Sequence, residues 1–241
     1  MPDSPDSDPL LRCDLLVFDL DGTLIDSRHD LANSVNATLA HLHRQHLDLD
    51  RIANFIGDGA AMLVSRSLQA TGTCDEQQMA IALPYFLDYY REHKLDHTYV
   101  YAGVLDALQT IRAASPHLPM AVLTNKPFRP SRIICQGLGL TTYFFANYGG
   151  DSFETKKPDP EGMTVLMREA GTLLGRTVSP QRTILVGDSH VDAETAHAAG
   201  TLSLGCTYGL DPDGLRRAQP TASVDSPHDW PAALRAMLPP R

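Results

Sequence analysis

Residues 15–27 read LLVFDLDGTLIDS. Four apolar residues, Leu15 to Phe18, run directly into Asp19, and a second carboxylate, Asp21, follows two positions later. A continuous apolar run of this length is typical of a strand that is buried on both faces of a parallel sheet. Asp, Gly and Thr are also ordinary turn residues, so a strand followed by a plain turn is the alternative interpretation.

The composition is that of an ordinary globular protein. The chain has 241 residues, of which 43% are hydrophobic and 20% are charged. This length allows one large domain, or a core domain with a smaller insert. Twenty Lys and Arg against 29 Asp and Glu give a net charge of −9. That charge argues against nucleic acid and membrane surfaces as partners, and an anionic substrate would need a local cation.

The four cysteines are widely separated and form no CxxC pair. This spacing argues against a disulfide framework or a zinc site, and it favours reduced thiols in a cytoplasmic protein. The sequence has no run of 18 or more apolar residues, so no membrane-spanning segment is predicted. Residues 1–10, MPDSPDSDPL, lack the pattern of a signal peptide, and we expect a disordered leader there.

Four short apolar runs predict the strands of a parallel sheet, and helical patterns lie between the later runs. The predicted strands are Leu15–Phe18, Met120–Leu123, Thr183–Val186 and Leu202–Cys206. The predicted helices of this part are Val104–Ala113, Pro130–Gly137, Pro160–Ala170 and Val191–Ala199. The sequence therefore predicts an α/β fold with a Rossmann-like parallel sheet as its core.

Residues 27–97 interrupt this alternation, because they carry helical signals alone. Ser27 is a suitable N-cap for the first helix of the segment. We therefore predict an inserted, all-helical cap domain that projects from the end of the first strand. The α/β core domain would comprise residues 11–26 and 98–241. The loop Gly57-Asp58-Gly59 is our candidate for the part of the insert that reaches toward the core.

Polar clusters follow the first three predicted strands, and another cluster lies between the second and third. In open parallel α/β sheets, ligands bind at the carboxyl ends of the strands, so adjacent strands would bring these clusters together. The groups include four carboxylates, which would repel one another when packed closely. Mg²⁺ relieves such repulsion and prefers oxygen ligands, so it is the expected cofactor. The clustered residues are Asp19, Asp21, Thr124, Asn125, Lys157, Asp188 and Asp192.

A metal, a carboxylate, a hydroxyl and a lysine together suit phosphoryl transfer. We assign Asp19 as the nucleophile, because a carboxylate can attack phosphorus and form an aspartyl-phosphate that water then cleaves. Asp21 follows two residues later, on the same side of an extended chain, and would act as general acid and base. Lys157 would hold the charge of the transferring group, and Gly22 would let the backbone approach the phosphate. The expected substrate contacts are Gly22, Thr23 and Asn125.

The motifs DLDGTL, LTNK, KKPDP and GDSHVD, in this order, resemble the four motifs of the haloacid dehalogenase superfamily. The resemblance spans residues 19 to 192, and the helical insert resembles that family's cap. It implies that Asp19 is both nucleophile and metal ligand, and that Asp21 places its backbone carbonyl on the metal. It also implies that Thr124 binds phosphate, that Lys157 neutralises it and that Asp188 binds Mg²⁺. Asp192 would bind the metal directly, or hold a residue that binds it, or simply be an acid that is favoured at a helix N-terminus.

Asp21 favours a phosphatase or phosphomutase, because the dehalogenating members of the superfamily lack this acid. The segments VFDLDGTLIDSRHDLANSVNATL and GGDSFETKKPDPEG are similar to the phosphoglycolate phosphatase branch, which implies 2-phosphoglycolate as substrate. Ala102 departs from that branch, where Pro usually stands before the following Gly-Val. A sugar-phosphate phosphatase, an inorganic pyrophosphatase and a phosphosugar mutase stay open. A phospho-acceptor signalling module and a catalytically silent binding protein are the alternatives from other classes.

Several cations have two interpretations. Lys126 and Arg129 are either surface charges or contacts to the rest of the substrate. Arg51 and Arg66 either support the insert or meet a substrate carboxylate. We expect a small phosphorylated metabolite as the partner and a monomer or homodimer as the assembly.

Overall fold

A computed structural model describes residues 12–238, so the predicted leader at 1–10 lies outside the described residues. Six parallel strands form one sheet in the order β5-β4-β1-β6-β7-β8. The strands are β1 (Leu15–Phe18), β4 (Met120–Leu123), β5 (Ala146–Tyr148), β6 (Thr183–Gly187), β7 (Leu202–Cys206) and β8 (Ala222–Val224). The predicted α/β fold and its four predicted strands are confirmed. The two edge strands were not predicted, because each is three residues long and only partly buried.

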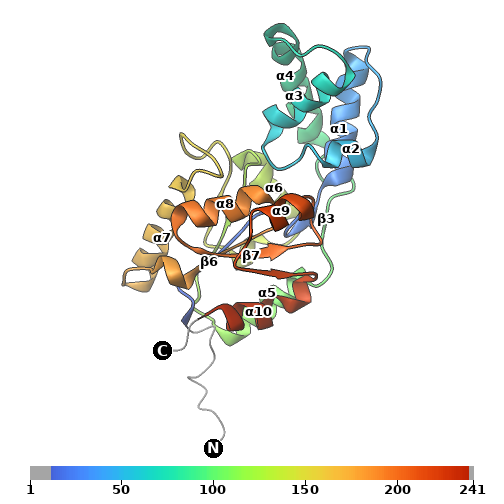
Figure 1. The fold of residues 1–241 in the computed structure, drawn as a ribbon. Helices are drawn as coiled ribbons and strands as arrows, with labels where there is room; N and C mark the ends of the chain where they lie inside the picture. Colours follow the sequence, from blue (N-terminus) through green and yellow to red (C-terminus); the bar gives the residue numbers. More distant parts are fainter. Residues whose placement is uncertain (1–11, 239–241) are drawn as a thin grey trace, which may run out of the picture.

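Helices cover both faces of the sheet because successive side chains of a strand point to opposite faces. Leu15 and Val17 pack in one apolar cluster with residues of α7 and α8, whereas Leu16 and Phe18 belong to a second cluster on the other face. Figure 1 shows α5 and α10 below the sheet and α8 above it. The flanking helices are α5 (Val104–Ala114), α6 (Phe128–Gly137), α7 (Glu161–Leu174), α8 (His190–Ala199), α9 (Pro212–Arg217) and α10 (Trp230–Met237).

Four helices follow β1 and lie together at one end of the molecule (Figure 1). They are α1 (Arg28–His41), α2 (Leu49–Ala53), α3 (Ala60–Thr71) and α4 (Glu76–His93). Buried residues such as Leu39, Leu68 and Phe86 pack them against one another. The chain enters and leaves this helical unit through two short strands, β2 (Ile25–Asp26) and β3 (Tyr99–Val100), which pair antiparallel. The two connections to the core are therefore tied together.

A buried carboxylate strengthens this double connection. Asp30 lies in the first turn of α1 and is 1% exposed. Its oxygens accept hydrogen bonds from the backbone N–H groups of His97 and Thr98 at 2.8–3.0 Å, and from the Thr98 hydroxyl at 2.7 Å. One side chain thus satisfies the donors of the returning segment just before β3. Buried donors that lose their acceptor carry a large desolvation penalty.

We expect Asp30→Ala to lower the free energy of unfolding by about 2–4 kcal/mol, because it leaves buried donors without a partner. Denaturation in urea can be followed by the fluorescence of Trp230, the single tryptophan of the chain, which is fully buried near Phe18. The matched control is Asp88→Ala, which breaks an exposed ion pair with Arg91 and should cost less than about 1 kcal/mol. Equal effects of the two substitutions would contradict the anchoring role of Asp30.

Candidate active site

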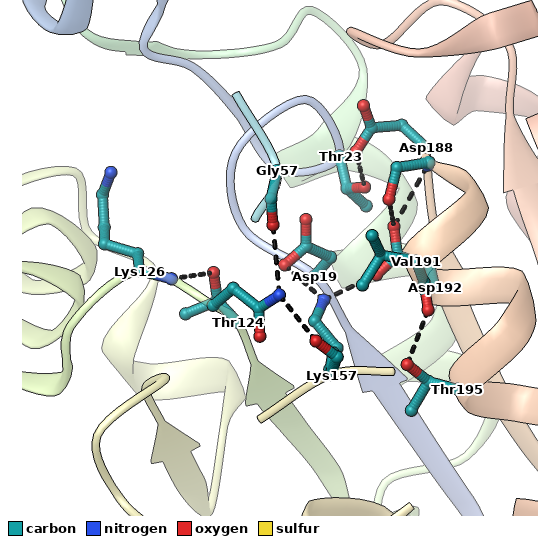
Figure 2. A network of polar contacts seen from close by, with 12 residues as sticks. Asp19, Thr23, Gly57, Thr124, Lys126, Lys157, Asp188, Val191, Asp192 and Thr195 are labelled. Atoms are coloured by element: carbon teal, nitrogen blue, oxygen red, sulfur yellow. Dashed lines mark hydrogen bonds and ion pairs between the residues drawn. The ribbon is translucent and has the colours of Figure 1, made fainter. Parts of the chain in front are cut away.

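The predicted clusters meet at the carboxyl edge of the sheet. β1 lies between β4 and β6 in parallel register, with Phe18 opposite both Val122 and Val186. The first residue after each of these strands carries a polar side chain: Asp19 after β1, Thr124 after β4 and Asp188 after β6. Because the strands are neighbours, these side chains lie close together. Figure 2 shows them around one centre, with Lys157 and Asp192 beside them.

Three of the four predicted carboxylates form a tight buried group. Asp19, Asp188 and Asp192 each place an oxygen within 4.8 Å of the others, and all three side chains are buried. Burial is the main reason that the pKa of Asp19 rises to about 6, and the charge of Asp192 adds to the rise. Burial, followed by the charges of Asp192 and Asp19, also raises the pKa of Asp188 well above its ordinary value. The ionised group is therefore strained in the absence of a compensating charge.

Lys157 supplies part of that charge. Its Nζ donates to Asp19 Oδ1 at 2.8 Å and to Asp192 Oδ1 at 2.6 Å. Burial disfavours the charged ammonium, but the two carboxylates outweigh it and raise the pKa of Lys157. One ammonium faces three carboxylates, so the group keeps a net negative charge and consists of hard oxygen donors. This donor set fits a divalent cation such as Mg²⁺.

The neighbours of these acids fix their orientation. Asp188 Oδ1 accepts from the Thr23 hydroxyl at 2.9 Å, and its Oδ2 accepts from the Leu210 N–H at 2.7 Å. Asp192 Oδ2 accepts from both the backbone and the hydroxyl of Ser189, which caps α8. Both oxygens of Asp192 are thus engaged by protein donors. In contrast, Asp19 Oδ2 has no protein partner among residues 12–238.

The Asp188 carboxylate leaves no room for a side chain at position 22. Gly22 adopts a φ of +90°, and a Cβ at this position would lie 2.1 Å from Asp188 Oδ2. No side chain could occupy that space. The structure shows a close approach of Gly22 to the Asp188 carboxylate, and the expected approach of its backbone to a phosphate stays a prediction. The Thr23 hydroxyl is likewise directed to Asp188.

The side chain of Asp21 lies apart from the acidic group. Lys126 Nζ contacts its Oδ1 at 2.9 Å, and the Ser27 hydroxyl donates to the same oxygen at 2.5 Å. Alternation along an extended chain does not apply here, because β1 ends at Phe18 and the chain turns around Asp21. Ser27 holds the predicted N-cap position of α1, but its hydroxyl makes no capping bond and serves Asp21 instead.

Lys126 is not a surface charge. It is 7% exposed, pairs with Asp21 and lies 4.8 Å from the centre of the Tyr90 ring. Arg129, in contrast, is exposed. The sequence left both interpretations of Lys126 open. Its position two residues after Thr124, in the polar cluster at the end of β4, was the signal that it belongs to the site.

Asn125 joins three segments of the site. Its Nδ2 donates to the carbonyl oxygens of Gly57 at 3.1 Å and Lys157 at 3.0 Å. The neighbouring Thr124 hydroxyl accepts from the Lys126 N–H, which leaves its own proton free to donate. Lys156 Nζ reaches the carbonyl oxygen of Asp58 at 2.6 Å. The loop Gly57-Asp58-Gly59 of the helical unit therefore contacts the core at the site.

Arg66 supports the same loop from within the helical unit. It pairs with Asp58 at 2.5 Å and donates to the carbonyl oxygen of Phe55. Arg51 donates to the carbonyl oxygen of Ala70. Both arginines bond within the helical unit.

A pocket of about 530 Å³, including its open mouth, lies between the helical unit and the core. The core contributes Asp19, Asp21, Thr124 and Lys126 to its lining. The helical unit contributes mainly apolar groups, among them Ile56, Leu63, Phe86 and Tyr90. The two predicted catalytic carboxylates thus face one shared space.

The family model of the haloacid dehalogenase-like hydrolases matches residues 16–206. The chain belongs to this family. A phosphoglycolate phosphatase of Pseudomonas putida is 37% identical over 230 residues, which cover 93% of this chain and 78% of that protein. A phosphoglycolate phosphatase of Chromobacterium violaceum is 39% identical over 196 residues, which cover 80% of this chain and 85% of that protein.

A solved structure is also similar to this hydrolase over most of its length. The crystal structure of a predicted phosphoglycolate phosphatase from Haemophilus somnus superposes with a TM-score of 0.84 at 28% identity, covering 92% of this chain and 98% of that chain. The predicted family and the predicted phosphatase class of enzyme are confirmed. None of the helices described in residues 12–238 is long and apolar enough to cross a membrane.

We expect Asp19→Asn to stabilise the metal-free hydrolase at pH 8 by about 1–3 kcal/mol. The pKa of Asp19 is raised from 3.8 to about 6 in the folded state, so the ionised form weakens the fold as the pH rises through this range. Asparagine keeps an oxygen for Lys157 and removes the charge. Thermal unfolding in a chelating buffer measures the effect, at roughly 2–4 °C per kcal/mol.

Mg²⁺ should reduce this difference in stability between the variant and the wild type. A tenfold excess over its dissociation constant adds about 1.4 kcal/mol to the wild type, and Asp19→Asn should gain less. The control variant is Asp213→Asn, whose carboxylate is 75% exposed and which should follow the wild type in both buffers. A lower stability of Asp19→Asn in the chelating buffer would show that carboxylate repulsion does not strain the fold.

Proposed function

We propose that this hydrolase is a Mg²⁺-dependent phosphomonoesterase that acts through an aspartyl-phosphate on Asp19, with 2-phosphoglycolate as its substrate. One observation carries the proposal: Asp19 is buried, Lys157 holds one of its oxygens and the other oxygen has no protein partner in residues 12–238. A carboxylate held in this way presents one oxygen to an electrophile. The Pseudomonas and Chromobacterium relatives carry the name phosphoglycolate phosphatase, which supports the choice of substrate.

Mg²⁺ would be held by the carboxylates of Asp19 and Asp188 and by the backbone carbonyl of Asp21, with Asp192 as a further ligand or as a support. When bound, Mg²⁺ would neutralise charge on the carboxylates and on the phosphoryl oxygens. Asp192 suits the supporting role better, because Lys157 and Ser189 already occupy both of its oxygens. Thr23 and Gly22 contribute by fixing Asp188, through a hydrogen bond and through the space left by the missing side chain.

In the first step, the free oxygen of Asp19 attacks phosphorus and the bond from phosphorus to the ester oxygen breaks. Asp21 donates a proton to that oxygen, and the alcohol leaves. Lys157 and the Thr124 hydroxyl stabilise the charge on the transferring group. In the second step, Asp21 takes a proton from water, the water oxygen attacks phosphorus, and the bond to Asp19 breaks. Phosphate leaves, and Asp19 and Asp21 regain their starting states.

We propose that residues 27–97 act as a cap domain on a core of residues 11–26 and 98–241. The contacts of Gly57 with Asn125 and of Asp58 with Lys156 support this role, because they place the cap loop at the edge of the site. A cap that closes here would exclude bulk water, which strengthens electrostatic interactions and limits side reactions. The largely apolar cap lining favours a small substrate with few hydroxyl groups.

Hydrolysis of a substrate panel with Mg²⁺ tests the proposal. We expect kcat/KM for 2-phosphoglycolate to exceed that for glucose 6-phosphate, glucose 1-phosphate and pyrophosphate by at least about a hundredfold, or roughly 2.7 kcal/mol. Asp19→Asn should abolish hydrolysis of every substrate, whereas Asp213→Asn should retain it. Equal rates across the panel would retain the phosphatase chemistry and refute 2-phosphoglycolate, and a preference for a sugar phosphate would favour that alternative.

Asp21→Asn should separate the two steps. With p-nitrophenyl phosphate, whose leaving group needs little protonation, Asp19 can still be phosphorylated, but no base remains to activate water. We therefore expect a rapid release of p-nitrophenol equal to the enzyme concentration, followed by turnover at least about a hundredfold slower than that of the wild type. Stopped-flow absorbance measures the release. A steady state without this burst would argue against Asp21 as the base, and Asp19→Asn should show neither phase.

A further inference from the structure

Lys126 is a buried cation that has no role in the two proposed reaction steps. It follows the end of β4 and is 7% exposed, and its Nζ lies 2.9 Å from Asp21 Oδ1. Taking an ammonium out of water is costly unless partners compensate it. An ammonium has three N–H donors, and Asp21 accounts for one of them. Lys126 therefore retains capacity for a second anionic partner.

The pocket offers no other cation for such a partner. Among the described residues that line it, Lys126 alone carries a positive charge. The other buried lysine of the site, Lys157, is engaged by Asp19 and Asp192 and does not line the pocket. In the cap, Arg66 is paired with Asp58. Recognition of a negative charge beyond the phosphoryl group thus falls to Lys126.

Tyr90 adds a second polar group at the same point. It lines the pocket from α4, and Lys126 lies over its ring at 4.8 Å. The Tyr90 hydroxyl is buried beside the Lys126 ammonium, which can only donate to it, and its own proton has no acceptor among the described residues. A buried hydroxyl proton without a partner is unusual in a folded protein and indicates a missing acceptor. A carboxylate near Lys126 would provide that acceptor.

The position of Lys126 matches the length of a short substrate. Asp21 must approach the ester oxygen to protonate it. In 2-phosphoglycolate, the carboxylate carbon lies two bonds beyond that oxygen. A cation in contact with Asp21 is therefore placed for the carboxylate of this compound, and it is too close to serve a charge at the far end of a hexose phosphate.

We propose that Lys126, together with the Tyr90 hydroxyl, binds the substrate carboxylate and is the specificity-determining residue of this hydrolase. The inference rests on the proposed function and deepens it. Lys126 Nζ would hold Asp21 Oδ1 and a carboxylate oxygen at the same time, and the Tyr90 hydroxyl would donate to the carboxylate. The site selects a short phosphorylated carboxylic acid, because its remaining lining is largely apolar.

The test compares two substrates that differ in the carboxylate alone. Ethyl phosphate has the same backbone as 2-phosphoglycolate with a methyl group in place of the carboxylate. The ratio of their kcat/KM values isolates carboxylate recognition from effects on Asp21, which act on both substrates. We expect Lys126→Met to lower this ratio on the order of a hundredfold, and Tyr90→Phe to lower it roughly 3- to 10-fold. Lys126→Arg, which keeps the charge, should retain most of the ratio.

Arg129→Met is the matched control, since Arg129 is a nearby cation that is exposed and does not line the pocket. It should leave the ratio unchanged. If the wild type prefers 2-phosphoglycolate and Lys126→Met keeps that preference, the inference is overturned and the proposed function stands. If the wild type hydrolyses both compounds equally, or neither, the choice of substrate and the inference are both overturned. Should Lys126→Met not fold, an unchanged ratio in Tyr90→Phe overturns the carboxylate site.

Discussion

The crowding of three buried carboxylates around a single ammonium is the constraint on which the site depends. Asp19, Asp188 and Asp192 each place an oxygen within 4.8 Å of the others, and among residues 12–238 Lys157 is the cation that pairs with this group. Hydrophobic strands buried on both faces hold the acids in place although ionisation favours their separation. The same crowding favours the binding of a hard cation. The repulsion that lowers the stability of the fold is therefore also what suits the site to a divalent metal.

Hydrogen bonds from neutral donors hold two of these carboxylates in place. Thr23 and the Leu210 N–H fix Asp188, and Ser189 fixes Asp192 at the start of α8. These bonds restrict the carboxylates to orientations that converge on one point. Lys157 binds one oxygen of Asp19, and the other oxygen has no hydrogen-bond partner among residues 12–238.

The strands and the clustered motifs were predictable because they depend on local apolar runs and on the general rule for parallel sheets. The edge strands were not, since three partly buried residues carry too little pattern. The contacts that Ser27 and Gly22 make with carboxylates were also not predicted. Each depends on a carboxylate that the fold brings near, Asp21 for Ser27 and Asp188 for Gly22. Lys126 belongs to the same class, because only the tertiary structure shows that its charge is buried against Asp21.

The helical unit and the core meet through contacts of different kinds. Where the chain enters and leaves the helical unit, Asp30 and the paired strands β2 and β3 tie the two connections together. At the site, the side-chain amide of Asn125 contacts Gly57 of the helical unit and Lys157 of the sheet domain. Asn125 thus links the Gly57 loop to the backbone of Lys157, and Lys156 makes a second contact with the same loop at Asp58. The segment that carries the lysine beside Asp19 is therefore held against the loop that borders the pocket.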